Sequence, residues 1–215
     1  MQKCYTLTGQ SVLFKPEYFE QFISCYKEAI PPSERESDSI IQRLVSQNNY
    51  FCILLIDEND RVCGFSLSYF GRDPNYVLLG YMGVTATRRS RGYGSLMMNI
   101  LKREFSDFDI IVEVDSIREN AEDLDQRRKR VRFYQRNGAY LVDGFEYIMP
   151  LDIPGFPAPD MDLMIIPQHS QAGIKPEHFN MLLESIYTDV YELQPSDPRI
   201  RQMSQTVPET GYRFN

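Results

Sequence analysis

Three consecutive runs rich in β-branched and aromatic residues limit the folds open to this chain. They cover residues 50–56, 62–69 and 76–84, and the first two are separated by a turn-forming Asp-Glu-Asn-Asp sequence at residues 57–60. This spacing predicts an antiparallel meander. A basic loop with two glycines and an amphipathic helix follow the third run directly, so the chain must combine a sheet with helices.

Other stretches show the periodicity of helices or the short apolar runs of buried strands. The predicted helices begin at Pro16, cover residues 38–47 behind a cap at Ser37 or Asp38, begin at Gly92, cover residues 124–136, and begin at Pro176. The further predicted strands cover residues 5–8, 110–114, a segment from Ala139, and residues 161–166 as a last core strand. The expected fold class is mixed α/β (α+β), with a mostly antiparallel central sheet flanked by helices.

A stiff, proline-containing loop precedes the last predicted strand. We predict a main domain at residues 1–166 and a C-terminal helical extension at residues 167–215. One apolar stripe of the helix in this extension is formed by Phe179, Leu183, Ile186 and Val190. The stripe either packs on its own domain or forms a homodimer interface, and the sequence leaves both open.

Charge and apolar content exclude several classes of partner. The 215-residue chain has a net charge of −7, which argues against nucleic-acid binding and mildly favours cationic partners. Its longest apolar stretch, around residues 77–84, is far shorter than the roughly 18 residues of a membrane-spanning helix, so we expect no membrane partner. The first residues lack the apolar segment of a secretory signal, which predicts a cytoplasmic protein.

The cysteines and histidines do not indicate a metal or redox site. No C-x-x-C pair occurs among the widely spaced Cys4, Cys25, Cys52 and Cys63. Thiols in strand-like runs usually act as small buried hydrophobes. His169 and His178 lie in the extension with no Ser or Cys partner suggested. We therefore expect no bound metal.

The segment from residue 80 to residue 98 carries the clearest chemical signal. A predicted strand runs into a basic loop that ends with Gly92 and Gly94 at the start of a helix. The start of a helix exposes N–H groups without intrahelical acceptors, and the helix dipole adds positive potential there. Glycine allows a phosphate to approach the backbone closely. The loop is therefore either a diphosphate-binding site or an ordinary helix start.

Two better-known phosphate motifs do not fit this loop. The third glycine of a dinucleotide-binding fingerprint is missing after Gly94, and the chain has no Gly-Lys-Ser/Thr sequence of a P-loop. Hydride transfer to a dinucleotide and ATP hydrolysis therefore lose support.

The motif Arg89-x-x-Gly92-x-Gly94 and a downstream Phe133-Tyr134-x-x-x-Gly-Ala sequence together resemble the GCN5-related N-acetyltransferase (GNAT) family. The resemblance covers about residues 1–166. The first motif matches in full, and the second departs only where Ala139 replaces a final aromatic residue. The resemblance implies an N-acetyltransferase that moves an acetyl or related acyl group from acetyl-CoA to a primary amine by direct attack.

The resemblance also implies where acetyl-CoA binds. The pantetheine arm would pair with the end of the third strand, and the diphosphate would lie on the basic loop. Gln126 stands where many relatives have an asparagine that contacts pantetheine. The basic run at residues 127–132 either reaches the 3′-phosphate or forms a solvated face. The implied donor-binding residues are Met82, Gly83, Val84, Arg88, Arg89, Ser90, Arg91, Gly92, Tyr93, Gly94, Ser95 and Gln126.

Acyl transfer to an amine requires a base, a stabilised oxyanion and a proton for the leaving thiolate. Strand alternation places Glu113 on the face opposite its neighbouring valines, which makes it the first candidate base, with Asp115 in reserve. Tyr134 is the candidate acid, since the family places this tyrosine beside the sulfur. A main-chain N–H near Val84 would hold the oxyanion. The alternatives are a solvated strand-end carboxylate for Glu113 and an aromatic packing residue for Tyr134.

Two other functions fit the same residues. The chain could bind acyl-CoA without catalysis, as a sensor in which residues 167–215 block the amine site, or it could serve as an interaction protein. The acceptor of an enzyme would be a small-molecule amine. The acidic balance favours a cationic amine weakly.

Overall fold

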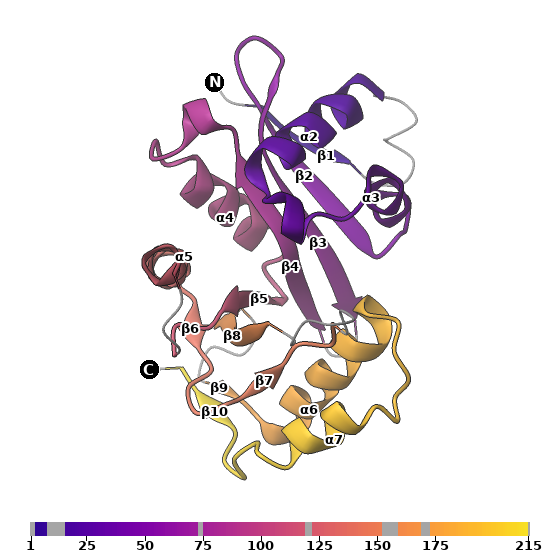
Figure 1. The fold of residues 1–215 in the computed structure, drawn as a ribbon, viewed down its shortest axis with the longest axis vertical. Coiled ribbons are helices and arrows are strands. Elements are labelled where there is room, and N and C mark those ends of the chain that lie inside the picture. The colour runs from indigo at the N-terminus through magenta and orange to yellow at the C-terminus, as the bar shows by residue number, and fades with distance from the viewer. Residues whose placement is uncertain are drawn as a thin grey trace. The chain divides into compact units, whose positions relative to one another are not determined.

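The computed structural model describes residues 3–7, 16–72, 75–118, 122–151, 159–168 and 173–214. The chain forms two compact units, coloured along its length in Figure 1. The first unit consists of Met1–Phe70 and Leu79–Glu104, and the second of Gly71–Leu78 and Phe105–Asn215. The predicted domain boundary after residue 166 stays a prediction.

The strands of the first unit follow the order β1-β2-β3-β4. Their bounds are Lys3–Leu7, Tyr50–Ile56, Val62–Arg72 and Asn75–Val84, of which β4 enters this unit at Leu79. The β1–β2 and β2–β3 pairs are antiparallel. The Asp57 carboxylate accepts the N–H groups of Asn59 at 2.9 Å and Arg61 at 3.0 Å, which closes the β2–β3 turn. The predicted β2–β3 hairpin is therefore confirmed, and β4 lies next to β3, in the predicted order of the three strands.

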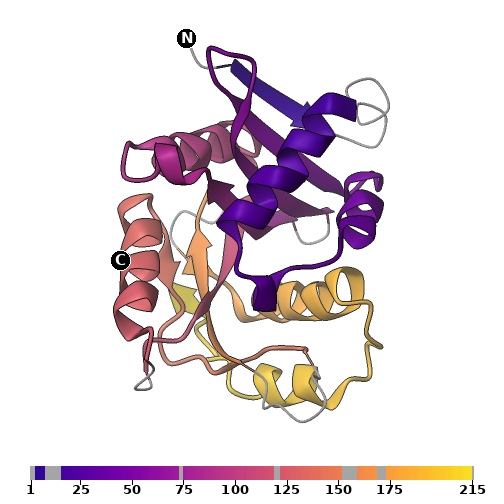
Figure 2. The same ribbon diagram turned by 45° about the horizontal axis from the view of Figure 1, so that its top comes forward.

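Helices cover both sides of these strands. They are α2 (Pro16–Ala29), α3 (Asp38–Val45) and α4 (Tyr93–Glu104), with short 3-10 turns at Pro32–Glu34 and Ala86–Arg88. The rings of Phe22 and Tyr26 on α2 contact Phe65 of β3, with centroids 5.2 Å and 5.9 Å apart. Figures 1 and 2 show α2 on one side of the strands and α4 on the other. The Ser37 hydroxyl accepts the Ile40 N–H, as predicted for the cap of α3.

The second unit contains the strand order β4-β5-β8-β6, with β7 also paired to β8. The bounds are β5 Asp109–Asp115, β6 Tyr140–Leu141, β7 Tyr147–Ile148 and β8 Asp160–Ile166. The first residues of β4 pair parallel with β5, and β5 pairs antiparallel with β8. The apolar run predicted as the last core strand forms β8, which pairs with β5, β6 and β7. Leu163, Met164 and Ile165 are all buried, so both faces of β8 are covered.

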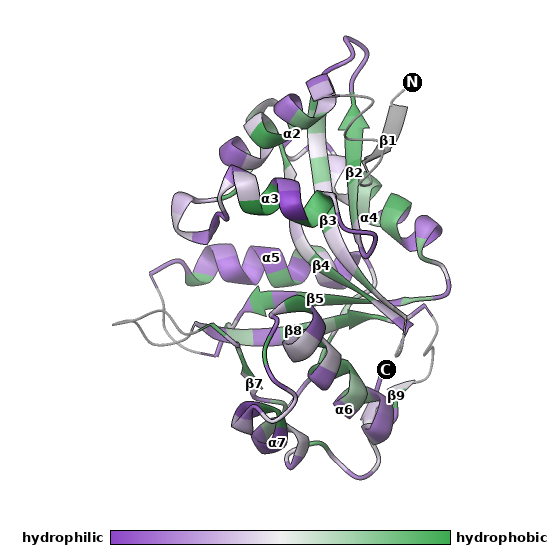
Figure 3. Ribbon diagram, turned by 90° about the vertical axis from the view of Figure 1, so that its right-hand side faces the viewer, coloured by the Kyte–Doolittle hydropathy of each residue, from purple (hydrophilic) through white to green (hydrophobic). Residues whose placement is uncertain are grey.

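Helices flank this layer as well, with α5 on one side of β5 and β8 and with α6 and α7 on the other (Figure 3). The bounds of α5, Leu124–Arg136, equal the predicted ones. Gly138 follows with φ +96°, a left-handed conformation that suits glycine. Only Val131 and Tyr134 of α5 are buried, which agrees with its hydrophilic colour in Figure 3.

The C-terminal segment contains more than helices. It forms β9 (Gly173–Ile174), α6 (Pro176–Ser185), a π-helical turn (Ile186–Val190), α7 (Pro198–Ser204) and β10 (Tyr212–Arg213), and β9 pairs antiparallel with β10. The tail after residue 194 has no strong sequence pattern, because α7 and β10 are too short to show one. α7 begins at Pro198, behind an Asp197 cap.

The apolar stripe of this segment is buried inside its own unit. The side chains of Phe179, Leu183 and Ile186 are fully buried. The Phe179 ring contacts Phe145 and Tyr212, each at 4.9 Å between centroids. These three side chains therefore pack within their own unit, while Val190, the fourth residue of the stripe, is half-buried.

Three thiols, of Cys25, Cys52 and Cys63, are free and buried. Burial raises the pKa of Cys25 to about 12, which keeps this thiol protonated and unreactive. Across the described residues, every helix is too short or too polar to cross a membrane.

Candidate functional site

The basic loop after β4 is anchored at its start. Thr85 donates its N–H to the carbonyl oxygen of Cys63 on β3 at 3.0 Å. Ala86 donates its N–H to the Glu28 carboxylate on α2 at 2.6 Å. The 3-10 turn Ala86–Arg88 is thereby fixed to two elements of the first unit, and the rest of the loop continues from a rigid base.

The end of this loop has the backbone shape of an anion-binding site. Ser90 and Gly92 have φ values of +59° and +82°. The first helical hydrogen bond of α4 runs from the Leu96 N–H to the Gly92 carbonyl oxygen, at 2.9 Å. The N–H groups of Tyr93–Ser95 come before it and have no acceptor within the helix. A Cβ atom at Gly92 would meet nothing within 4 Å. The glycine is thus needed for the backbone conformation, and the space before the helix start is open.

The three arginines of the loop differ in their contacts. Arg88 forms an ion pair with Asp57 at 3.1 Å and lies over the Tyr93 ring at 5.5 Å. Arg89 is exposed and reaches main-chain oxygens only at 3.5 Å. Arg91 is exposed, and no ion pair of it occurs among the described residues. The guanidinium groups of Arg89 and Arg91 are therefore accessible to an anionic ligand. That of Arg88 is already bound to Asp57.

The end of β4 carries the other predicted donor-binding residues. The parallel register with β5 covers only Tyr76–Leu78. Met82, Gly83 and Val84 lie beyond it and are half-buried. A Cβ at Gly83 would lie 2.5 Å from the Ala29 side chain, so this glycine allows α2 to pack closely on β4.

Glu113 on β5 is held by two tyrosines of the second unit. The Tyr147 hydroxyl donates to Oε1, and the Tyr191 hydroxyl donates to Oε2 at 2.9 Å. The side chain is half-buried. Burial raises the pKa of Glu113, while the two hydrogen bonds oppose that rise. Glu113 is therefore a constrained carboxylate rather than a solvated strand end.

Asp115, the reserve base, is engaged elsewhere. Its carboxylate forms an ion pair with Arg130 of α5. Arg127, also on α5, donates to the Ser116 carbonyl oxygen at 3.2 Å. Part of the basic run thus ties α5 to the end of β5, while Arg128 and its neighbours Lys129 and Arg132 are exposed.

Tyr134 is buried, with 8% of its surface exposed, and its ring contacts Phe133 at 5.2 Å. Burial raises its pKa to about 12, against a lowering effect of Arg130, so the phenol keeps its proton at neutral pH. Gln126 is exposed on the same helix. His178 is exposed, and His169 lies outside the described residues.

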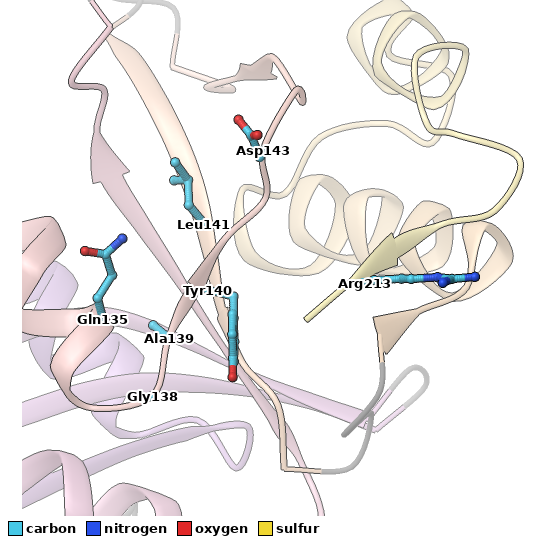
Figure 4. Close-up of a pocket in the computed structure, with 7 residues that line it drawn as sticks. All are labelled: Gln135, Gly138, Ala139, Tyr140, Leu141, Asp143 and Arg213. Atoms are coloured by element: carbon cyan, nitrogen blue, oxygen red, sulfur yellow. The ribbon is translucent and has the colours of Figure 1, made fainter. Parts of the chain in front are cut away.

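A pocket of about 560 Å³ lies beside the C-terminal end of α5 (Figure 4). Seen there, Tyr140 stands between Gln135 of α5 and Arg213 of β10. The lining residues are Gln135, Gly138, Ala139, Tyr140, Leu141, Asp143 and Arg213. None of the predicted site residues lines this pocket.

Sequence reasoning missed Tyr147 and Tyr191. Tyr147 lies in a two-residue strand, and Tyr191 follows the π-helical turn. Neither position belongs to a periodic pattern. Tyr191 is 78 residues from Glu113, so no local signal could have joined them.

Residues 14–139 match the family model described as the acetyltransferase (GNAT) family. No curated protein matches the chain in sequence.

Solved structures of acetyltransferases are similar to this chain. A GNAT-family protein from Bacteroides thetaiotaomicron has a TM-score of 0.65 and 18% identity, covering 89% of this chain and 99% of that chain. Arabidopsis thaliana NAA60 in complex with acetyl-CoA has a TM-score of 0.55 and 14% identity, covering 77% and 97%. A chimeric spermidine N-acetyltransferase from Vibrio cholerae has a TM-score of 0.55 and 15% identity, covering 78% and 95%. The likeness at these identities concerns the fold, and it confirms the predicted mixed α/β class.

Proposed function

The chain belongs to the acetyltransferase (GNAT) family, and from this premise we propose that it moves an acetyl group from acetyl-CoA to a primary amine by direct attack. The observation that carries the proposal is the open helix start at Gly92, flanked by the exposed Arg89 and Arg91. Exposed amides at a helix N-terminus and mobile guanidinium groups are the donors that a diphosphate requires. The NAA60 structure holds acetyl-CoA, which supports the same donor here.

The donor-binding residues are assigned as follows. The amides at the start of α4 and the guanidinium groups of Arg89 and Arg91 bind the diphosphate. The backbone of Met82–Val84, which lies beyond the β4–β5 register, binds the pantetheine arm. Gln126 is exposed on α5 and supplies a side-chain amide for the same arm. Bound acetyl-CoA supplies a thioester carbon for an amine to attack.

Glu113 and Tyr134 perform the proton transfers. The amine nitrogen forms a bond to the acyl carbon and loses a proton to Glu113, and the carbon–sulfur bond breaks as Tyr134 donates its proton to the sulfur. The raised pKa of Glu113 brings this base closer to the pKa of an amine. The pKa of Tyr134, raised to about 12, keeps the acid protonated at neutral pH. A main-chain N–H near Val84 holds the oxyanion.

The acceptor is proposed to be a small cationic amine. The net charge of −7 attracts cations, and one similar structure is that of a spermidine N-acetyltransferase. A cytoplasmic location agrees with free, buried thiols.

Calorimetric titration of acetyl-CoA tests the donor site. Gly92→Asp places a carboxylate at the helix start and should abolish binding. Gly144→Asp is a matched control, because Gly144 also has a positive φ, +72°, and open space around its Cβ position. Binding by the wild type and by Gly144→Asp, but not by Gly92→Asp, supports the proposal. Equal loss in both variants contradicts a specific role of Gly92, and no binding by the wild type contradicts the donor site.

An amine screen separates an enzyme from a sensor. The expected result is acetylated product with at least one small cationic amine. Tight acetyl-CoA binding without product from any amine favours the non-catalytic sensor instead.

A further inference from the structure

We propose that Tyr191, in the C-terminal segment, is a positioning residue that fixes the Glu113 carboxylate for proton transfer. The inference rests on the proposed function, in which Glu113 is the base. It assigns the C-terminal segment a part in the catalytic site.

The carboxylate of Glu113 has one phenol on each oxygen. Tyr147 donates to Oε1 from β7, and Tyr191 donates to Oε2 at 2.9 Å from the segment after α6. Two donors on separate elements fix the carboxylate plane as well as its position, since rotation would break both bonds. The Tyr191 hydroxyl also lies 3.6 Å from the Met149 sulfur, which leaves little room for movement.

The backbone before Tyr191 is unusual. Residues Ile186–Val190 form a π-helical turn, and the Tyr191 N–H donates to the Ile186 carbonyl oxygen at 3.2 Å. Glu192, directly after Tyr191, has φ +56°, in the left-handed region that side chains other than glycine rarely adopt. An inserted residue turns each later side chain by roughly 100° relative to an uninterrupted α-helix. Such local strain is typically retained at functional positions.

This strained turn is held on both sides. The hydroxyls of Tyr76 on β4 and Ser185 are 2.9 Å apart, and the Ser185 hydroxyl donates to Asp189 at 2.6 Å. The Tyr187 hydroxyl donates to the Ile148 carbonyl oxygen on β7. These hydrogen bonds fix the π-helical turn, and the turn orients the Tyr191 hydroxyl toward Glu113.

Among the residues that the structure describes, the charged groups of the surrounding elements are paired or exposed, and the two phenols are the groups that hydrogen-bond to Glu113. The exposed carboxylates are Glu146 and Glu192. The ion pairs are Asp115 with Arg130, Arg118 with Asp160 and Asp162, and Asp197 with Arg199, while Asp189 accepts from Ser185. Removing one phenol hydroxyl should therefore destabilise the charged form of Glu113 alone.

The experiment compares Tyr191→Phe with Tyr187→Phe. Each variant removes one phenol hydroxyl, within the π-helical turn for Tyr187 and directly after it for Tyr191, but the hydroxyl of Tyr187 binds a main-chain carbonyl. Carbon-13 NMR of protein labelled at the glutamate carboxyl follows the titration of Glu113, which is assigned by its loss in Glu113→Gln. We expect a titration midpoint at higher pH in Tyr191→Phe and an unchanged one in Tyr187→Phe. Tyr147→Phe is a second variant in which the midpoint should also move to higher pH.

Kinetics provide the second readout. The acidic limb of the kcat/KM profile should move to higher pH together with the NMR midpoint, and activity at a fixed pH on that limb should fall roughly tenfold when the limb moves by one pH unit. An unchanged midpoint in Tyr191→Phe overturns the positioning role whether or not the protein is active. A midpoint that moves while the kinetic limb does not rejects Glu113 as the base, and with it the catalytic part of the inference.

Discussion

Nη2 of Arg88 lies 3.1 Å from Oδ2 of Asp57, so a residue of the basic loop is bound to the β2–β3 turn. Asp57 is 9% exposed and accepts two main-chain N–H groups as well. Burial tends to raise its pKa, but these hydrogen bonds and Arg88 outweigh that effect and lower it. Arg88 therefore compensates a largely buried charge of the first unit.

Arg88 and Arg91 should respond differently to the same substitution. Arg91→Gln removes an exposed guanidinium from the proposed diphosphate site, and we expect acetyl-CoA affinity to fall roughly tenfold with unchanged thermal stability. Arg88→Gln leaves Asp57 without its guanidinium and should lower the unfolding temperature. Calorimetry and thermal melts of both variants check this. If Arg88→Gln lowers acetyl-CoA affinity and leaves the unfolding temperature unchanged, the structural role given to Arg88 is wrong.

Glu113 should make the free energy of unfolding depend on pH. Its folded pKa is raised, so its contribution to stability is fully present below the unfolded pKa of about 4.3 and is lost as pH rises through the folded value. Relative to the wild type, Glu113→Gln should therefore gain stability as the pH rises from the unfolded to the folded pKa of Glu113. The gain is at most about 1.4 kcal/mol per pH unit in that range.

Urea unfolding of the wild type and Glu113→Gln at several pH values measures this difference. Glu146→Gln, at an exposed glutamate, is measured in parallel as a matched charge-removing variant. A flat difference for Glu113→Gln would mean that its carboxyl titrates alike in the folded and unfolded chain.

Tyr134→Phe should lower kcat by about a hundredfold while acetyl-CoA affinity changes little, because the phenol acts only when the thiolate leaves. Steady-state kinetics and calorimetry measure the two quantities. Tyr140→Phe removes a phenol hydroxyl from a half-exposed residue outside the proposed site and should leave both unchanged. An unaltered kcat in Tyr134→Phe would remove this residue from the mechanism.

Two glycines of β4 should differ sharply when replaced by alanine. A Cβ at Gly83 would lie 2.5 Å from the Cβ of Ala29 and 2.8 Å from the Phe65 ring, whereas one at Gly80 has only an ordinary contact, at 3.5 Å. Gly83→Ala should lower the free energy of unfolding by about 1–3 kcal/mol, as overpacking does. Gly80→Ala should be nearly neutral. Chemical denaturation compares the two, and equal effects would contradict the close packing of α2 on β4.

Much of the fold could be predicted because its signals are local. The bounds of α5 follow from helical spacing and from Gly138, and the cap of α3 follows from Ser37. The motif around Gly92 identified the family, which the family match confirms. These features depend on residues within one or two turns of each other.

The rest of the site could not be predicted because it depends on distant partners. Alternation placed Glu113 on a strand face but could not show which groups cover that face. Asp115 was predicted as a reserve base because the sequence does not show its ion pair with Arg130, which joins β5 to α5. The place of β8 beside β5 likewise follows from three-dimensional packing rather than from its order in the chain.

The sequence separation within the second unit affects how the protein folds. The β2–β3 hairpin of the first unit closes through a short turn, whereas the bond from Tyr191 to Glu113 joins residues 78 positions apart. Contacts across long loops form slowly, because chain entropy is lost before the contacts stabilise the structure. We therefore expect the second unit to complete its folding later than the hairpin. In a newly made chain, the β2–β3 hairpin would therefore be ordered before the Glu113 carboxylate receives the hydrogen bond of Tyr191.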